Sequence, residues 1–524
     1  MGETTTRDFS RRGFLGAAAL GIGTLAVGGL ASCAPAASGA APADSKEANW
    51  DNEYEVIVVG GGGAGLTAAY SALESGAKNV VVFEKGAQCG GTTALAEGAV
   101  QAAGTPWQKD AGITDDSADA LYNFWLTNGE GIINKDLIRT MADNAADNVQ
   151  WMADSFNITY SQVFGAYPTP YLPEEYLKDR IHLITDASDK TKTGGAVWTT
   201  NALGAIKDKG GTVETNTEVT ALVMDGEAVA GVTTKDGKNH KATKGVILAA
   251  AGIEHNEELA LRYNQQHYWD LTTQNVITAP TDTGDGIVMG IAAGAQTAFH
   301  GCVDLLLPTW SYTNNKNPEV PYILVNTRGQ RFVREDTTYA YHCRAIFNEA
   351  MQWGGEKGAT WMILDSKLNT SDKACAWSDN AEGGKAAREA ALADGTLVQA
   401  DSIETLAQAI GLDTTNLATT VQTWNTNADA GADPVLGRIK QLTALNEAPF
   451  YAWKTQNSNI GSIGGLVIDT NAAVLNEDGA PIPHLFAAGA NSAGWLEPYY
   501  PGSGTCLQGA LNWGRIAGKS AAQA

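Results

Sequence analysis

Three glycines and one acid carry the clearest chemical signal in the chain. Gly60, Gly62 and Gly65 follow the spacing G-x-G-x-x-G, and Glu84 follows them along the chain. Glycines at this spacing permit a tight turn, a close approach of the backbone to a pyrophosphate, and close packing of a helix on a strand. An acid roughly 20 residues further on is placed to bind a ribose hydroxyl. The spacing therefore indicates a dinucleotide-binding site.

The elements that must position these residues are also visible in the sequence. Residues 54–59 (YEVIVV) form an apolar, β-branched run that predicts a buried strand. Residues 66–75 have the apolar periodicity of a helix, and residues 79–83 predict a second strand that ends at Glu84. A helix that starts directly after the glycine turn presents its N-terminus to a phosphate. This context favours a ligand-binding loop over a glycine turn without a ligand, and leaves both FAD and NAD open.

Further segments decide between these cofactors. Residues 89–94 (CGGTTA) resemble the second phosphate- and isoalloxazine-contacting loop of the FAD-dependent fumarate reductase and 3-ketosteroid dehydrogenase superfamily. Residues 244–252 (KGVILAAAG), 283–286 (TGDG) and 484–489 (HLFAAG) resemble three later segments of that superfamily, in the same order. The resemblance extends over about residues 53–520 and implies non-covalently bound FAD.

The resemblance also implies which residues contact FAD. The expected cofactor residues are Gly60, Gly62, Gly63, Ala64, Gly65, Glu84, Lys85, Gly90, Gly91, Thr92, Thr93, Ala251, Gly252, Asp285, Gly489, Asn491, Ser503 and Leu507. The chain departs from the superfamily at Ala490, where a glutamate is usual. One contact to the ribityl chain is therefore expected to be missing or to be made by Asn491.

Two positions bear on the substrate. Residues 326–339 (NTRGQRFVREDTTY) resemble a segment in which fumarate reductases end on a proton-donating arginine; here that position is Tyr339. The ketosteroid dehydrogenases carry a catalytic tyrosine there, and the chain keeps their spacing of Glu335 to Tyr339. Residues 500–504 (YPGSG) resemble the Y-P-G-P-G of ketosteroid dehydrogenases, in which the tyrosine hydroxyl and the last glycine N–H hold a carbonyl oxygen. Fumarate reductases have a carboxylate-binding arginine in that loop.

Two carboxylate-binding histidines of the fumarate enzymes are also expected to be absent. Residues 307–309 (LPT) stand where those enzymes have H-P-T, and residues 459–465 (NIGSIGG) stand where they have a histidine-bearing loop. A dicarboxylate needs cationic partners, which arginine supplies and tyrosine does not. The pattern therefore favours an uncharged acceptor.

The resulting hypothesis is an enzyme that reduces a C=C bond conjugated to a carbonyl, in an enone, a steroid-like ketone or an unsaturated lactone. Hydride is expected to pass from flavin N5 to the β-carbon, while Tyr500 and the Gly504 N–H hold the oxygen, where negative charge develops. Tyr339 is expected to donate the proton, because a phenol with its ordinary pKa near 10 is protonated at about pH 7. The catalytic residues are thus expected to be Tyr339, Tyr500 and Gly504.

Three alternatives stay open. The same chemistry in reverse would be a 3-ketosteroid dehydrogenase. A fumarate- or urocanate-like unsaturated carboxylate reductase would need Arg334 or Arg344 to enter the pocket. A protein of another class would keep the flavin for stability and act as a binding lipoprotein.

The resemblance implies an α/β fold in which a Rossmann-like FAD-binding domain of the GR2 type is interrupted by an α+β capping domain. The FAD-binding domain is expected at residues 53–285 and 446–524, and the capping domain at residues 286–445.

Composition limits the partners. The chain of 524 residues has 58 acids against 35 bases, which argues against nucleic acid. Its six cysteines show no C-x-x-C spacing, so no metal site, iron–sulfur cluster or haem is expected. Electrons should therefore come from a separate carrier, either quinone-linked in the membrane or a cytochrome, as suits a terminal reductase of anaerobic respiration.

The N-terminal residues indicate export. Residues 10–15 (SRRGFL) before an apolar stretch favour a twin-arginine signal over a Sec signal with an incidental arginine pair. Residues 30–33 (LASC) resemble a lipoprotein cleavage site, which would leave Cys33 lipid-anchored at the extracytoplasmic face of the membrane. Cleavage at an ordinary small-residue site is the alternative. Residues 1–33 are thus expected to be a signal and residues 34–52 a flexible linker.

Overall fold

The fold is taken from a computed structural model, which describes residues 42–46, 48–165, 172–173, 176–307, 322–353, 360–371, 377–496, 498 and 500–524. The expected export signal, with Cys33, lies outside the described residues. So do Pro308 and Thr309. Within the described part of the chain, no helix combines the length and the apolar character needed to cross a membrane.

The largest sheet carries the glycine turn. It has nine strands in the order β1-β8-β9-β10-β2-β3-β7, with β19 paired to β10 and β18 paired to β19. β10, β2, β3 and β7 run parallel to one another, as does β19 beside β10. The strands are β1 (Ala43–Asp44), β2 (Trp50–Val59), β3 (Val80–Phe83), β7 (Thr212–Glu214), β8 (Val219–Asp225), β9 (Ala228–Thr234), β10 (Asn239–Leu248), β18 (Ala473–Leu475) and β19 (Pro481–Ala487).

The described residues at the end of the expected linker form strands, whereas a flexible chain was expected there. β1 pairs with β8, and β2 already begins at Trp50. Gly231 lies so close to Trp50 that a Cβ there would meet the indole at 2.8 Å. This contact fixes the start of β2 against the neighbouring strands.

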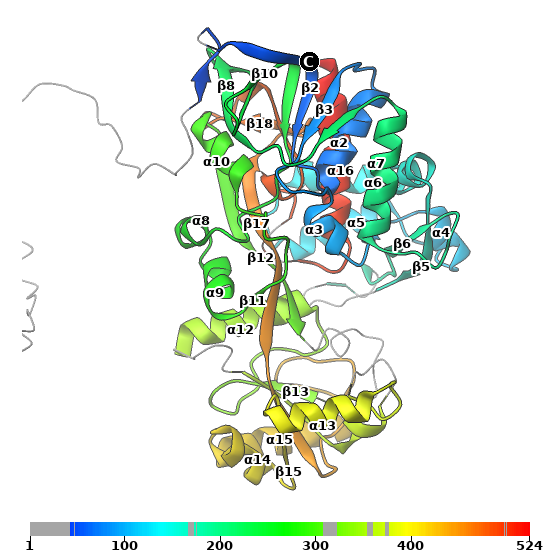
Figure 1. Ribbon diagram of the computed structural model, residues 1–524. Coiled ribbons are helices and arrows are strands. Elements are labelled where there is room, and N and C mark those ends of the chain that lie inside the picture. Colours follow the sequence, from blue (N-terminus) through cyan, green and yellow to red (C-terminus); the bar gives the residue numbers. More distant parts are fainter. Residues whose placement is uncertain are drawn as a thin grey trace, which may run out of the picture. The chain divides into compact units, whose positions relative to one another are not determined.

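Two helices from opposite ends of the sequence pack together beside this sheet. α2 (Gly63–Glu74) follows the glycine turn, and α16 (Thr505–Gln523) ends the chain; they lie side by side in Figure 1. Gly514 and Gly518 make the close approach possible, because a Cβ on either would collide with a backbone carbonyl of α2. α3 (Gly91–Leu95) and α7 (Gly195–Asp208) also contact α2.

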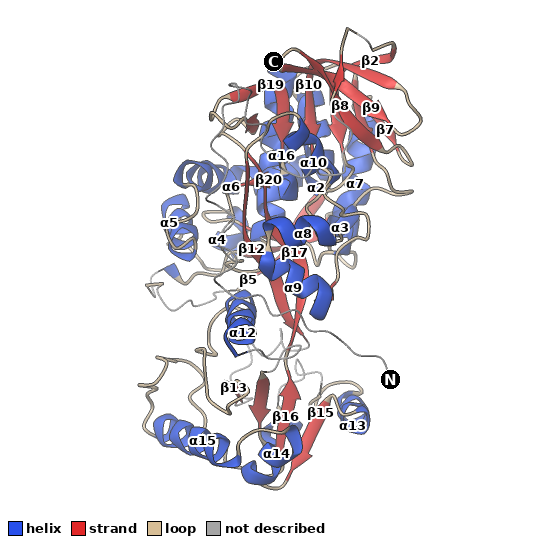
Figure 2. Cartoon of the chain, turned by 90° about the vertical axis from the view of Figure 1, so that its left-hand side faces the viewer, coloured by secondary structure: helices blue, strands red, loops and turns tan. Residues whose placement is uncertain are grey.

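A second sheet has the order β11-β17-β12, with β20 paired to β17. β12 and β17 form its long antiparallel pair, and α8 and α9 lie beside them in both views (Figures 1 and 2). Its elements are α8 (Glu257–Tyr263), α9 (Gln265–Thr273), β11 (Asn275–Val276), α10 (Asp285–Ala292), β12 (Thr297–Leu307), β17 (Gln456–Val467), η3 (Gly489–Asn491) and β20 (Ser492–Ala493).

A third sheet, β13-β14-β16-β15, is antiparallel throughout. β16 follows residue 445, where the capping domain is expected to end, yet its strand partners all precede that residue. The exact division into domains stays a prediction. The elements are β13 (Tyr322–Val325), α12 (Tyr339–Trp353), β14 (Trp361–Leu364), η2 (Ser366–Thr370), α13 (Gly384–Asp394), β15 (Leu397–Ala400), α14 (Ile403–Ile410), α15 (Thr414–Asp429) and β16 (Phe450–Lys454).

A small sheet, β4-β6-β5, and three helices complete the described chain. They are β4 (Ala99–Gln101), α4 (Pro106–Asp110), α5 (Ala118–Asn128), α6 (Lys135–Phe156), β5 (Ile158–Phe164) and β6 (Ile181–Asp186). β4 packs on α16, so this layer closes one side of the space in front of α2 and α16.

Candidate active site

The glycine turn lies between β2 and α2, as its spacing predicts. Gly60 has φ +103°, and a Cβ there would collide with the carbonyl of Ala249 on the chain after β10. A Cβ on Gly65 would collide with the carbonyl of Gly60, whereas a Cβ on Gly62 would meet no atom closer than the Gly90 carbonyl oxygen at 4.0 Å. The turn therefore needs glycine at the first and third positions for packing, while the second leaves open space for a ligand.

The N-terminus of α2 fits a pyrophosphate. Its N-cap residue is Gly62, which offers no side-chain cap, and the N–H of Gly63 donates to Thr93 Oγ1 at 3.1 Å. Uncapped N–H groups at a helix N-terminus are the backbone donors that phosphate oxygens accept. These residues fit the diphosphate of a dinucleotide.

The acid that follows β3 lies over the same turn. Glu84 Oε2 accepts from the Gly61 N–H at 2.8 Å, and Glu84 Oε1 accepts from the Gly86 N–H at 2.6 Å. Next to it, Lys85 Nζ lies 2.6 Å from Asp285 Oδ2. A carboxylate held in this way can still accept from ribose hydroxyls, because each oxygen has a second lone pair.

A cavity of about 440 Å³ runs along these elements and brings most of the predicted residues together. Those lining it are Gly60, Gly62, Gly63, Ala64, Glu84, Lys85, Gly90, Gly91, Thr92, Thr93, Ala251, Asp285, Tyr339, Gly489, Tyr500, Ser503, Gly504 and Leu507.

Three of the expected cofactor residues do not line the cavity. Gly65 packs against Gly60, and a Cβ on Gly252 would meet the Glu254 carboxylate at 2.5 Å. Asn491 Oδ1 accepts from the Ala250 N–H at 2.6 Å, and its amide donates to the Ala251 carbonyl at 2.6 Å. The amide of Asn491 is thus engaged with the backbone that follows β10, which it holds in place.

Tyr339 lies at the start of α12 and is 1% exposed. Its phenol oxygen is 2.7 Å from Ser503 Oγ, and its ring centroid is 6.1 Å from that of Tyr500. Residues far apart in the sequence thus bring two phenols and a serine hydroxyl to one end of the cavity.

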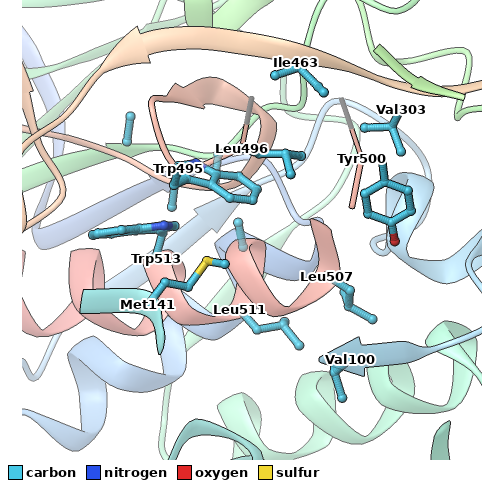
Figure 3. Close-up of a cluster of buried hydrophobic side chains, with 14 of the residues drawn as sticks. Val100, Met141, Val303, Ile463, Trp495, Leu496, Tyr500, Leu507, Leu511 and Trp513 are labelled. Atoms are coloured by element: carbon cyan, nitrogen blue, oxygen red, sulfur yellow. The ribbon is translucent and has the colours of Figure 1, made fainter. Parts of the chain in front are cut away.

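Tyr500 and Gly504 contact each other directly. The Gly504 N–H donates to the Tyr500 hydroxyl at 2.7 Å. Gly504 is the N-cap of α16 with φ +92°, and a Cβ there would meet the Val100 carbonyl carbon at 2.8 Å. Figure 3 shows Val303 beside Tyr500, with the phenol oxygen pointing away from Val303. The N-terminal end of α16 therefore directs a backbone donor, and its partial positive charge, toward this phenol.

Charge is scarce around the tyrosines. Among the described residues that line the cavity, Lys85 is the sole lysine, arginine or histidine. Arg334 pairs with Asp336 at 2.6 Å, and Arg344 donates to Gln266 Oε1. Neither arginine lines the cavity in this structure.

A buried ion network positions the segment that leads to Tyr339. Glu335 is 0% exposed and pairs with Arg331 at 2.6 Å and with Arg438 at 3.4 Å. It also accepts from the Leu324 N–H of β13 at 3.1 Å. Glu335 therefore anchors the start of α12 to the third sheet. One helical turn on, burial lowers the pKa of His342 to about 4, which keeps the imidazole neutral.

Two acids of the cavity wall were missed by the sequence analysis. Burial, with the nearby Glu254, raises the pKa of Asp282 to about 7, although Thr92 Oγ1 donates to it at 2.5 Å. Glu254 Oε1 accepts from the Ser462 N–H at 2.8 Å, while no described residue bonds to its buried Oε2. An acid two residues after the glycine of the 244–252 segment was the available signal for Glu254.

A sheet with parallel central strands, a glycine turn that leads into a helix N-terminus and an acid after the next strand together define a dinucleotide-binding protein. The end of its cavity that the two phenols line has the form of a substrate site. The chain belongs to the FAD binding domain family, whose model matches residues 55–507. It is an FAD-binding oxidoreductase with the mixed α/β fold of fumarate reductases and ketosteroid dehydrogenases.

Three proteins with known names or structures show which members of the family this chain is similar to. The chain is 29% identical to digoxin reductase of Eggerthella lenta, over 98% of this chain and 97% of that protein. It superposes on 3-ketosteroid-Δ4-(5α)-dehydrogenase of Rhodococcus jostii, solved with 4-androstene-3,17-dione, with a TM-score of 0.76 and 25% identity over 92% of this chain and 100% of that one. A flavocytochrome c3 fumarate reductase gives a TM-score of 0.65 and 26% identity over 91% and 79% of the two chains. The predicted superfamily, cofactor and fold class are confirmed.

Proposed function

We propose that this flavoprotein reduces a C=C bond conjugated to an uncharged carbonyl group, as in an enone, a steroid-like ketone or an unsaturated lactone. The observation that carries the proposal is the meeting of the Tyr339 phenol, the Tyr500 phenol and the Gly504 N–H at one end of the cofactor cavity. Lys85, the cationic side chain among the described residues of the cavity wall, pairs with Asp285 at the nucleotide end of the cavity. Uncharged hydrogen-bond donors with no cation beside them suit the oxygen of a neutral carbonyl group better than the carboxylates of a dicarboxylate substrate.

The Tyr500 hydroxyl provides the donor for the carbonyl oxygen, and the Gly504 N–H, which was expected to hold that oxygen as well, donates instead to the Tyr500 hydroxyl. Bound, reduced FAD would supply the hydride, and negative charge would develop on the carbonyl oxygen as the hydride adds to the β-carbon. An oxygen that accepts from the Tyr500 hydroxyl keeps the Gly504 N–H in contact with the phenol, since the hydroxyl can accept one hydrogen bond while donating another. The backbone donor makes the phenol a stronger donor in turn.

Tyr339 supplies the proton that completes the reduction at the α-carbon. Its hydroxyl is buried, and the Ser503 hydroxyl 2.7 Å away can fix its orientation and pass a proton back to it after turnover. A hydride at one carbon and a proton at the other saturate the bond. Positioned proton donors of this kind contribute roughly 10²–10⁴-fold to a rate.

The reverse reaction is the second candidate. The superposition on a ketosteroid dehydrogenase solved with a 3-ketosteroid favours a substrate of that shape, and the same three groups would serve an oxidation. Comparing rates with a dye that donates electrons and a dye that accepts them separates the two directions.

The electron supply and the location of the protein are part of the proposal. Electrons are expected from a separate quinone-linked carrier or cytochrome, and residues 1–33 are expected to direct twin-arginine export, with lipid at Cys33. Membrane fractionation with mass spectrometry of the mature N-terminus tests the anchor. Cleavage without lipid would refute it.

Purified holoenzyme with reduced viologen should be given a panel of enones, unsaturated lactones and 3-ketosteroids, with fumarate and urocanate in parallel. Turnover of one or more neutral acceptors is expected. Activity on the carboxylates alone would overturn the substrate class, and a flavin that is reduced but never reoxidised by any alkene would support the binding lipoprotein.

A further inference from the structure

A buried cluster of metal-ligand side chains lies behind the wall of the cavity. His267 and Asp270 stand one turn apart on α9, so both face the same way, toward β12. Side chains alternate along a strand: Val303 and Leu305 of β12 line the cavity, and Cys302 points to the other side, toward α9. Figure 2 shows α9 against β12 and β17 at this place.

The three side chains converge. One ligand atom from each of His267, Asp270 and Cys302 lies within 4.8 Å of the other two. The exposed fractions of the three residues are 0%, 0% and 1%. Nitrogen, oxygen and sulfur donors so close together, and so fully removed from water, need either protons or a cation between them.

The tautomer of His267 is set by its surroundings. Nε2 lies 3.1 Å from the carbonyl oxygen of Glu254, which can only accept, so Nε2 carries the hydrogen. The lone pair of a neutral imidazole is then on Nδ1, and no described residue bonds to this buried atom. A backbone carbonyl at the far nitrogen is the usual partner of a metal-bound histidine.

The carboxylate of Asp270 is oriented in a similar way. Asn459 donates to Asp270 Oδ2 at 3.1 Å and to Asp304 Oδ1 at 3.1 Å, while Asp270 Oδ1 is buried and bonds to none of the described residues. Gln266 donates to Asp304 Oδ2 at 2.7 Å. Neither carboxylate has an ion pair with a described lysine or arginine. Asp270 also interacts directly with the side chains of Asp304 and Cys302, so these contacts and the amides together hold the two acids beside the cluster.

We propose that His267 Nδ1, Asp270 Oδ1 and Cys302 Sγ bind a divalent ion of the zinc class. Mixed imidazole, thiolate and carboxylate ligands at short distance suit tetrahedral Zn²⁺ or Co²⁺ better than Mg²⁺ or Ca²⁺, which prefer oxygen alone. Asp304, held by the same Asn459 amide, or water supplies the fourth ligand. Binding releases the thiol proton of Cys302 and ties α9 to the strand that forms the cavity wall.

The test uses full-length holoenzyme produced with added zinc, or exchanged with cobalt. After dialysis, the wild type is expected to retain about one metal ion per chain. His267→Gln and Cys302→Ser should retain less than about a tenth of that, since structural zinc needs its ligands. His240→Gln, which changes a buried histidine outside the cluster, should retain the metal.

Cobalt gives a readout that needs no variant. The Co²⁺ form should show d–d bands of a tetrahedral site at wavelengths beyond flavin absorption, and these bands decide the question if a variant fails to fold. Wild-type protein without stoichiometric metal and without these bands would overturn the proposal, as would variants that keep the metal. Wild-type-like flavin content in His240→Gln shows that the fold of this control is intact.

Discussion

The hydroxyl of Ser503 lies 2.7 Å from the phenol oxygen of Tyr339, although 164 residues separate them in the sequence. Ser503 belongs to the loop that also carries Tyr500 and Gly504, so one short loop contacts both phenols. Ketosteroid dehydrogenases resembling this chain have proline at that position in Y-P-G-P-G, and proline offers no hydroxyl. The hydrogen bond between Ser503 and Tyr339 therefore depends on a residue at which this chain departs from the Y-P-G-P-G pattern.

Replacing Tyr339 by phenylalanine removes the proposed proton donor. Steady-state kcat with a neutral enone is expected to fall by roughly 10²–10⁴-fold, because a positioned acid contributes about that much. Tyr341→Phe, two residues along the same helix and outside the cavity wall, is the matched control and should keep the wild-type rate. A Tyr339→Phe enzyme that keeps its rate would remove Tyr339 from the mechanism.

Tyr500→Phe tests the oxygen site. Loss of one donor to a developing negative charge is expected to reduce kcat by roughly 10²–10³-fold. Gly504→Ala should be more disruptive, since a Cβ there would meet the backbone of Val100 at 2.8 Å and Gly504 has φ +92°. Stopped-flow reduction of the flavin, compared with its reoxidation by enone, locates the effect; unchanged reoxidation in Tyr500→Phe contradicts the assignment.

Ser503 is proposed as a positioning residue, so its effect should be smaller. Ser503→Ala removes one hydrogen bond worth about 1 kcal/mol, or roughly fivefold in kcat. Ser503→Thr, which keeps a hydroxyl, should restore most of the rate. The pH profile of kcat should move in Ser503→Ala and return in Ser503→Thr; two variants with the same profile would reduce the contact to packing.

Glu335→Ala should destabilise the protein, because it leaves Arg438 buried without its carboxylate and leaves Arg331 paired with Asp433 alone. Breaking one partner of a buried ion network costs about 3–5 kcal/mol. The thermal midpoint should drop, and kcat should drop with it as Tyr339 loses its anchored position. Glu404→Ala, an exposed acid on α14, serves as the control. Equal midpoints for the two variants would show that the network adds no stability.

Asp282 makes stability depend on pH. Its pKa of about 7 lies above the ordinary value, so the folded protein holds a proton that the unfolded chain releases from about pH 4 upward. Stability is therefore expected to fall as pH rises toward 7 and then to level off, by at most about 4 kcal/mol. Asp282→Asn cannot lose this proton, so its thermal midpoint should exceed that of the wild type by more at pH 8 than at pH 5. A gap independent of pH would contradict the assignment.

Local patterns predicted the nucleotide half of the site well. Residues 54–59 lie in β2, residues 66–75 overlap α2, and Glu84 follows β3, because a strand, a glycine turn and a helix are determined by neighbouring residues. Helix α2 nevertheless begins at Gly63, three residues before its apolar periodicity is visible.

Contacts between distant segments were beyond the reach of such patterns. Tyr339 and Ser503 meet because the start of α12 and the loop before α16 border one cavity, which no local spacing encodes. The engagement of Asn491 with the backbone of Ala250 likewise depends on its place beside β10. The three buried residues of the proposed metal site include an i, i+3 pair, but Cys302 reaches them only because α9 packs against β12.

The packing of α16 on α2 determines which parts of the chain must be folded before the cofactor can be held. The cavity is lined by Gly60 in the glycine turn and by Leu507 and Ala510 of α16, which lie far apart in the sequence. A chain that has folded only around the glycine turn therefore presents an incomplete cavity. A variant without α16 is expected to lose the flavin.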